Sequence, residues 1–284
     1  ANAGTDDAAC GQQRNKWERR YGAVQIKGDG EAQPLLSPGD EFADYETWDW
    51  GNLDASEAKT PEMLPGEYVR SGLQRGLMLE DALGVNPFKV GLVGAGDAHT
   101  GLSTPDDDNF FGKFTAYEPS EHRSNHLAKL NKALGIDYCS WRHITSGLTP
   151  VWAPTNTRGA IFDAMERREV YATTGPRIRV RFFGGWDFDA SDALRRDLAL
   201  VRYCRGVPMG ADLRPGHAAP SFLASALPDP MDAHLPRPQT ATGRVDAPTA
   251  PGDKAHDAAS YARRALALPP APAAPASAHR VVAH

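Results

Sequence analysis

Two polar residues end the most informative stretch of the sequence. The apolar run from Phe88 to Ala95 is followed by Asp97 and His99, with glycines on either side. In parallel α/β proteins, catalytic and ligand-binding residues lie at the carboxyl ends of the strands, because the loops there carry polar groups over a rigid sheet. Alternate residues of an extended segment point the same way, so we expect Asp97 and His99 to face one pocket. Their side chains suit zinc, manganese or iron, although two ligands do not complete a site and strand-end hydrogen bonding is the alternative.

Two other segments carry groups that suit an anionic substrate. Lys27 and Glu31 flank a Gly-Asp-Gly sequence, which is first of all a turn. Lys27 could orient an anion, and Glu31 could hydrogen-bond to a metal ligand. Thr174 and Arg177 belong to a Thr-Thr-Gly-Pro-Arg segment that could present hydroxyls, an amide and a guanidinium to a phosphate or carboxylate. A bend between two strands explains that segment equally well.

The remaining polar clusters favour structural explanations. His122 and His126 are four residues apart and would share one face of a helix, but no third ligand is evident near them and His143 stands alone. We therefore expect a solvated helix face there. The acidic run from Asp106 to Asp108 lacks the glycine and the distal glutamate of a calcium-binding EF-hand loop.

Composition excludes several classes of partner. The chain has 284 residues and a formal net charge of -5, which argues against a nucleic acid as the main partner because that affinity comes from massed lysine and arginine. Its three cysteines form no zinc-finger spacing and no evident disulfide framework. No apolar run approaches the roughly 18 residues that a membrane helix needs. A small anionic molecule is the expected partner.

The elements that must position Asp97 and His99 follow from hydrophobic spacing. Residues 21–27 predict a strand whose turn is 28–31, and residues from Leu64 to Leu83 predict a helix that ends at Gly84. The helix leads into the strand at 88–95. Strand, excursion, helix and strand in this order are typical of a parallel α/β unit.

The second half of the chain predicts a helix and two strands. Asn156 or Thr157 could cap a helix over 158–168. Residues 170–183 predict a strand, a break at Gly175, and a second strand in which arginine alternates with apolar residues.

Three regions follow from these patterns. We expect an irregular segment over 1–20, a partial α/β domain over 21–223 and a low-complexity, disordered tail rich in proline and alanine over 224–284, because such a composition cannot bury enough apolar surface to offset chain entropy. A shifted reading frame is one hypothesis for the tail, and a disordered linker is the other.

Several motifs in one order resemble the domain-of-unknown-function 3604 family, including Gly-Asp-Ala-His-Thr-Gly around Asp97 and His99. The resemblance covers roughly residues 17–223. That family is similar to the polymerase and histidinol phosphatase (PHP) superfamily of metal-dependent hydrolases. The motifs occupy residues 25–31, 36–46, 60–64, 96–101, 108–112, 147–153 and 171–186.

The resemblance implies the C-terminal portion of a distorted PHP-like β/α barrel with divalent metals (zinc, manganese or iron) at its mouth. Asp97 and His99 match the final Asp-x-His motif of such proteins. All nine histidines lie at or after residue 99, so no His-x-His motif precedes it, and we expect a fragment. Gln33 also stands where members of the family often have histidine.

The expected activity is hydrolysis of a phosphoester by metal-activated water, with Asp97 and His99 as ligands and with Arg177 or Lys27 orienting the substrate. This rests on superfamily analogy. The alternative is a truncated, non-catalytic protein or binding module. Relatives often carry export signals, so the resemblance is compatible with an extracytoplasmic origin.

Overall fold

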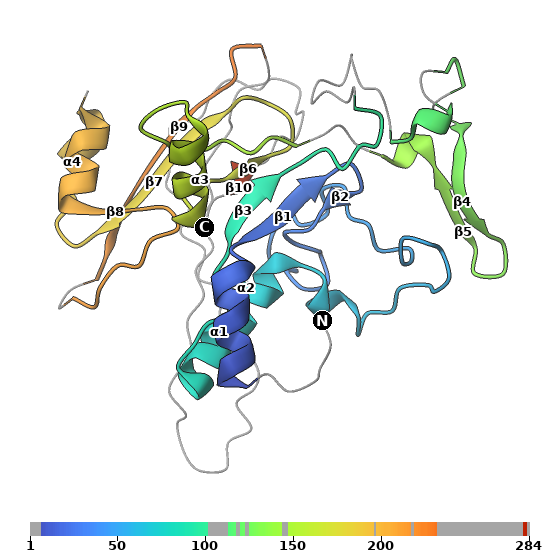
Figure 1. Cartoon of the computed structure of the whole chain (residues 1–284), viewed down its shortest axis with the longest axis horizontal. Helices are drawn as coiled ribbons and strands as arrows, with labels where there is room; N and C mark the ends of the chain where they lie inside the picture. Colours follow the sequence, from blue (N-terminus) through green and yellow to red (C-terminus); the bar gives the residue numbers. More distant parts are fainter. Residues whose placement is uncertain are drawn as a thin grey trace.

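A small sheet built around one central strand carries the candidate site (Figure 1). Strand β1 (Arg20–Gln25) pairs in parallel with β3 (Gly91–Gly94) and antiparallel with β2 (Gly28–Asp29). This computed structural model describes residues 7–101, 113–117, 120–122, 125–143, 147–195, 197–216, 219–231 and 281–282.

The predicted parallel α/β unit is confirmed. A 3₁₀ turn, η1 (Leu64–Gly66), precedes α2 (Val69–Leu83), and α2 connects β1 to β3. The helix ends at Gly84, whose φ of 72° is the left-handed conformation that glycine adopts without a steric cost. Side chains from α2, β1 and β3 form one apolar core, which consists of Ala23, Val24, Val69, Val90, Leu92 and Ala172.

The turn between β1 and β2 differs from the prediction. It consists of Ile26 and Lys27, and Gly28 and Asp29 already form the returning strand. Gly28 has a φ of 107°, and a Cβ atom there would lie 2.0 Å from the carbonyl oxygen of Glu46. The Gly-Asp-Gly sequence therefore serves a close approach between two backbone segments, and the turn itself carries Lys27.

A second sheet has β7 (Arg179–Gly185) at its centre, between β8 (Gly206–Pro208) and β9 (Ser221–Leu227). It confirms the predicted strand after Gly175. Helix α4 (Leu198–Arg205) contacts β8, and the 3₁₀ helix η6 (Ala190–Leu194) contacts β9. Helix α3 (Arg158–Glu166) begins as predicted, because the Thr157 side chain accepts a hydrogen bond from the Ala160 amide at 3.3 Å.

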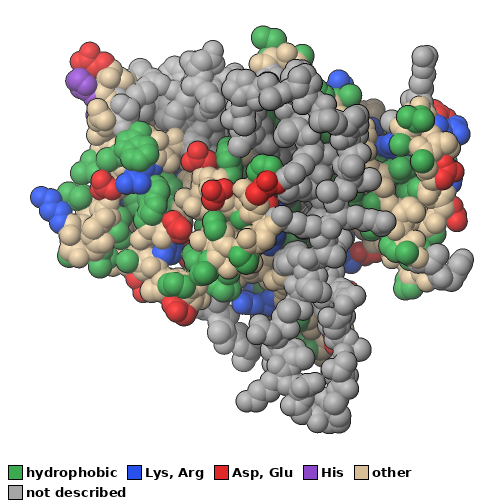
Figure 2. All heavy atoms as spheres, turned by 180° about the vertical axis from the view of Figure 1, so that it is seen from behind, with side chains coloured by type: hydrophobic (Ala, Val, Ile, Leu, Met, Phe, Trp, Pro, Cys, Tyr) green, Lys and Arg blue, Asp and Glu red, His purple; other side chains and the backbone are tan. Residues whose placement is uncertain are grey.

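The predicted helix around His122 and His126 is wrong. His122 lies in a turn, and His126 comes just before the hairpin of β4 (Leu127–Asn131) and β5 (Ile136–Cys139). In Figure 1 this hairpin lies at one end of the molecule and the β7 sheet at the other, with β1 and β3 between them. Figure 2 shows hydrophobic side chains on the surface of the molecule. In and next to the hairpin, Leu127, Leu130 and Trp141 are exposed.

The remaining elements are short. Residues 8–17, expected to be irregular, form α1 (Ala8–Trp17), and the side chain of Asp7 caps it by accepting from the Cys10 amide at 2.7 Å. The two-residue strand β6 (Ala172–Thr173) lies next to β3 and pairs antiparallel with β10 (Val281–Val282). Two further 3₁₀ turns are η3 (Thr115–Tyr117) and η5 (Ser140–Arg142).

The described strands form two three-stranded and two two-stranded sheets, and none of these closes into a barrel. The chain is therefore mixed α/β as predicted, whereas the barrel remains a prediction from resemblance. Most of the expected tail, residues 232–280, lies outside the described residues, as does the acidic run at 106–108. In the described ranges no helix is both long and apolar enough to cross a membrane.

Candidate functional site

Asp97 and His99 lie in one pocket beyond the carboxyl end of β3. Backbone pairing continues past the strand, since the Ala95 amide donates to Val24 and Gly96 accepts from Ile26. The chain then turns at Asp97, whose φ of 47° is left-handed. The predicted convergence is present, because His99 Nε2 lies 3.5 Å from Asp97 Oδ1. The predicted reason, alternation along an extended segment, is wrong, since a left-handed residue interrupts that segment.

A left-handed aspartate is an uncommon conformation that short polar side chains tolerate better than most. Neighbouring backbone holds it in place, because the His99 amide donates to the Lys113 carbonyl oxygen at 2.7 Å. Such conformations persist only where the surroundings impose them, and they cluster at functional sites.

Two lysines converge on the Asp97 carboxylate. Lys27 reaches it from the β1–β2 turn and forms an ion pair with Oδ2. Lys113 Nζ lies 2.9 Å from the same oxygen and 3.3 Å from His99 Nε2, and it also donates to the Asp97 carbonyl. Their side chains are only 14% and 5% exposed. Burial, and then the like charge of Lys113, lowers the pKa of Lys27 to about 8.

Aromatic side chains form much of the remaining wall. The pocket has a volume of about 320 Å³. The Trp48 ring stacks on the His143 imidazole, with centroids 5.9 Å apart, and also contacts Tyr138 at 4.9 Å. Phe114 packs edge-on against His99 at 5.3 Å. The lining residues are Lys27, Trp48, Leu53, Asp97, His99, Lys113, Phe114, Ala128, Lys129, Tyr138 and His143.

His143 is a neutral imidazole at pH 7. Burial, followed by the charges of Lys113 and Lys27, lowers its pKa to about 4. Its Nδ1 atom is buried and has no hydrogen-bond partner among the described residues. An unsatisfied buried nitrogen beside two ammonium groups indicates a position where a ligand atom could bind.

His143 predicts a specific dependence of stability on pH. Unfolded chains take up this proton near pH 6.5 but the folded protein only near pH 4, so the free energy of unfolding falls as the pH drops through that window. We expect the His143→Phe variant, which keeps the ring contact with Trp48, to lose about 2 kcal/mol less than the wild type between pH 7 and pH 4.5 in urea unfolding. The exposed His122→Phe variant is the control, and equal losses in all three proteins would contradict the assignment.

The described residues do not fit a complete metal centre. No group of three or more histidine, cysteine, aspartate or glutamate side chains suited to a metal occurs in the described ranges. Asp97 and His99 are two of the ligands that such a centre needs, and two ammonium groups already neutralise the Asp97 carboxylate. These residues therefore supply at most part of a metal site.

The other predicted site residues do not line this pocket. Glu31 is 5% exposed and pairs with Arg70 of α2 at 2.6 Å, and Arg70 also binds Asp40 at 2.6 Å. Glu31 thus anchors the segment after β2 to the helix. Thr174 and Arg177 lie at the bend between β6 and β7, where the Arg177 amide donates to Asp229 at 2.7 Å.

Sequence reasoning missed part of the pocket. No sequence pattern marks Lys113, and His143 stands alone in the sequence. Neither residue stands at a spacing from Asp97 that a regular strand or helix would bring together. The charge and aromatic pattern of the site arises from contacts between distant segments, so no local signal marks it.

The fold and pocket define a mixed α/β protein whose strand-end aspartate and histidine meet two lysines inside an aromatic wall. The sequence matches the family described as "Protein of unknown function (DUF3604)" over residues 2–269, and the chain belongs to that family. The predicted family is thereby confirmed, and the match extends beyond residues 17–223 at both ends. No curated protein and no solved structure was found to match the chain.

Proposed function

We propose that the chain binds the anionic group of a small organic molecule at Lys27 and Lys113, and that this pocket belongs to the active site of a metal-dependent hydrolase of phosphoester-like substrates. The observation that carries the proposal is the convergence of buried Lys113 and largely buried Lys27 on the single carboxylate of Asp97. With both lysines protonated, these three groups have one excess positive charge. The Asp97 side chain is 38% exposed, so an oxyanion could enter from solvent and compensate that charge beside the two lysines.

The shape of the pocket supports a small molecule with a ring or an apolar body. Its volume of about 320 Å³ is at the lower end of ligand sites. Trp48, Phe114 and Tyr138 offer ring faces and edges to such a body, while Lys27 and Lys113 lie at the polar side. Lysine suits this role because it binds an oxyanion as a mobile point charge.

The hydrolase part of the proposal rests on Asp97 and His99 together with the superfamily analogy. The competing candidate is a binding module without catalysis. It is favoured by the same ion pairs, because a carboxylate held by two ammonium groups is a poorer metal ligand. Metal binding separates the two candidates.

We expect the full chain to bind added Zn²⁺ or Mn²⁺ at one site, and we expect the Asp97→Ala/His99→Ala variant to lose that site. Elemental analysis after gel filtration and titration calorimetry would measure both. Asp163→Ala/His122→Ala is the matched control, since it removes one aspartate and one histidine from exposed positions on α3 and on the turn at residue 122.

Each result selects one candidate. Metal lost only from the Asp97/His99 variant supports the hydrolase and justifies a screen of phosphate and carboxylate esters. A protein with a native circular dichroism spectrum that binds phenylphosphonate but no metal is a binding module. A folded protein that binds neither contradicts the whole proposal.

A further inference from the structure

A groove on the second sheet is lined by Arg179 and Arg181, and within the described ranges neither forms an ion pair with a carboxylate. It lies between α4 and the face of β7 and β9 that carries Arg179, Arg181 and Phe183. Its volume is about 310 Å³. The ring of Phe183 packs edge-on against Tyr203 of α4, with centroids 5.1 Å apart. The groove is thus an opening beside a packed helix–sheet contact, and its wall includes Trp152, Leu200, Ser225 and Leu227.

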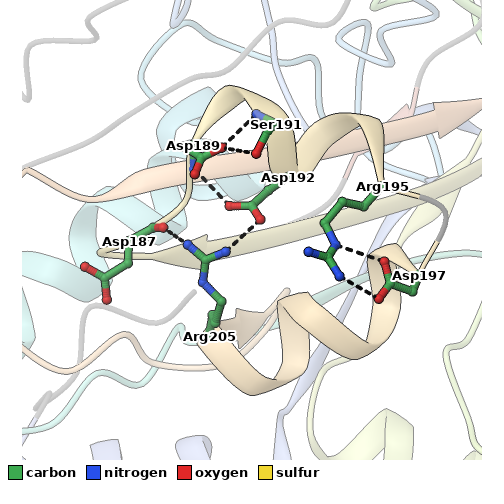
Figure 3. Close-up of polar contacts among 7 residues, drawn as sticks. All are labelled: Asp187, Asp189, Ser191, Asp192, Arg195, Asp197 and Arg205. Carbon is green, nitrogen blue, oxygen red and sulfur yellow. Dashed lines mark hydrogen bonds and ion pairs between the residues drawn. The ribbon is translucent and has the colours of Figure 1, made fainter.

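Two nearby arginines form ion pairs with aspartates. Arg195 forms a two-pronged ion pair with Asp197, with both nitrogen–oxygen distances 2.9 Å, and Arg205 binds Asp192 at 2.7 Å (Figure 3). In the described part of the chain, neither Arg179 nor Arg181 has a carboxylate within ion-pair distance. Asp197 borders the groove, but Arg195 already engages both of its oxygens.

Arg202 is a third arginine close to Arg181, but it does not line the groove. It lies on α4 with only 1% exposure, and its Nε and Nη1 atoms have no hydrogen-bond partner. Its guanidinium carbon is 5.5 Å from the centre of the Phe183 ring. Burial, and then the nearby charge of Arg181, lowers the pKa of Arg202, and the charge of Asp192 opposes this shift.

A contact with an aromatic ring fixes the position of the Arg181 guanidinium. Its guanidinium carbon lies 3.6 Å from the centre of the Trp152 ring, and that indole is fixed in turn by its N–H bond to the Val180 carbonyl at 2.8 Å. The Arg181 side chain also hydrogen-bonds to Tyr203, and its remaining N–H groups can contact a planar or tetrahedral oxyanion. Leu200 and Leu227 are 68% and 50% exposed and give the groove an apolar floor beside the charges.

We propose that this groove is a binding site for a small organic anion, in which an oxyanion head contacts Arg179 and Arg181 and a short alkyl body covers Leu200 and Leu227. The site is separate from the Lys27 pocket and independent of its proposed function. Two guanidinium groups can bind a carboxylate or a phosphate through paired hydrogen bonds, so the shared chemistry is an oxyanion on an apolar body.

Four probes with the full chain test the head and the body separately. Titration calorimetry or ligand-observed NMR would compare octanoate, octyl phosphate, 1-octanol and inorganic phosphate. We expect octanoate or octyl phosphate, or both, to bind at least tenfold more tightly than 1-octanol and than inorganic phosphate. We expect Arg179→Gln/Arg181→Gln to weaken that binding at least tenfold, with an unchanged circular dichroism spectrum because neither side chain is buried.

The control is Arg14→Gln/Arg158→Gln, which removes the same charge from helices α1 and α3 and should leave the affinity unchanged. All of these measurements use the Lys27→Met/Lys113→Met background, so that the other pocket, which is also proposed to bind organic anions, does not contribute. Equal binding of octanoate and 1-octanol, equal weakening by the two arginine double variants, or no binding of either octyl anion would each overturn the proposal.

Discussion

Replacing Lys27 and Lys113 together with methionine is expected to weaken the binding of phenylphosphonate about a hundredfold. The change removes two charge-assisted contacts and leaves the Asp97 carboxylate to repel the anion. Hydrogen bonds to charged groups contribute about 1.5–3 kcal/mol each, so a loss of about 3 kcal/mol is a conservative expectation. Titration calorimetry at pH 7, where Lys27 is still protonated, would measure it.

Lys59 offers a closely matched control. Its side chain is 14% exposed, as that of Lys27 is, and it forms an ion pair with Glu67 outside the pocket. The Lys59→Met variant should bind phenylphosphonate like the wild type. An affinity that stays unchanged in the Lys27/Lys113 variant would remove the basis for anion recognition at this pocket.

The same lysine variant also separates anion recognition from metal ligation. With both ammonium groups gone, Asp97 and His99 face each other without a competing charge. We therefore expect added Zn²⁺ to bind at least as tightly as in the wild type while phenylphosphonate binding falls. A loss of both activities would instead indicate that the pocket had collapsed.

The Gly28→Ala substitution is expected to lower the free energy of unfolding by about 3 kcal/mol or more. Its Cβ atom would lie 2.0 Å from the Glu46 carbonyl oxygen, which is backbone and cannot rotate away, and the φ of 107° is unfavourable for any residue with a side chain. The Asp29 amide donates to that same carbonyl at 2.9 Å, so relieving the clash also breaks a hydrogen bond. Urea unfolding monitored by tryptophan fluorescence would measure the loss.

Gly22→Ala in the neighbouring strand is the control, because no atom lies within 4 Å of the position its Cβ would take. We expect it to change stability by less than about 1 kcal/mol. Phenylphosphonate binding should weaken in the Gly28 variant alone, since Gly28 directly follows the turn that carries Lys27. Similar stabilities for the two variants would show that the approach to Glu46 is not required.

Local spacing predicted the elements whose stability is largely local. The helix that ends at Gly84, the Thr157 cap and the arginine alternation in β7 all depend on residues within one or two turns or strand repeats. Helix α1 was missed because Gly11 is its only buried residue among those described, so it has no apolar stripe to detect. The β1–β2 turn was misplaced because the contact with Glu46, eighteen residues away, decides where glycine is needed.

The sequence by itself determined the family, the β1–α2–β3 unit and the placement of Asp97 and His99 at the end of a strand. Tertiary structure alone decided that Lys113 and His143 join them, that Glu31 pairs with Arg70 instead, and that Arg179 and Arg181 line a groove under α4. The physical reason is the separation of the interacting residues along the sequence. Hydrogen-bonded periodicity leaves a pattern in neighbouring residues, whereas charges from distant segments meet only when the core has fixed the paths of their backbones.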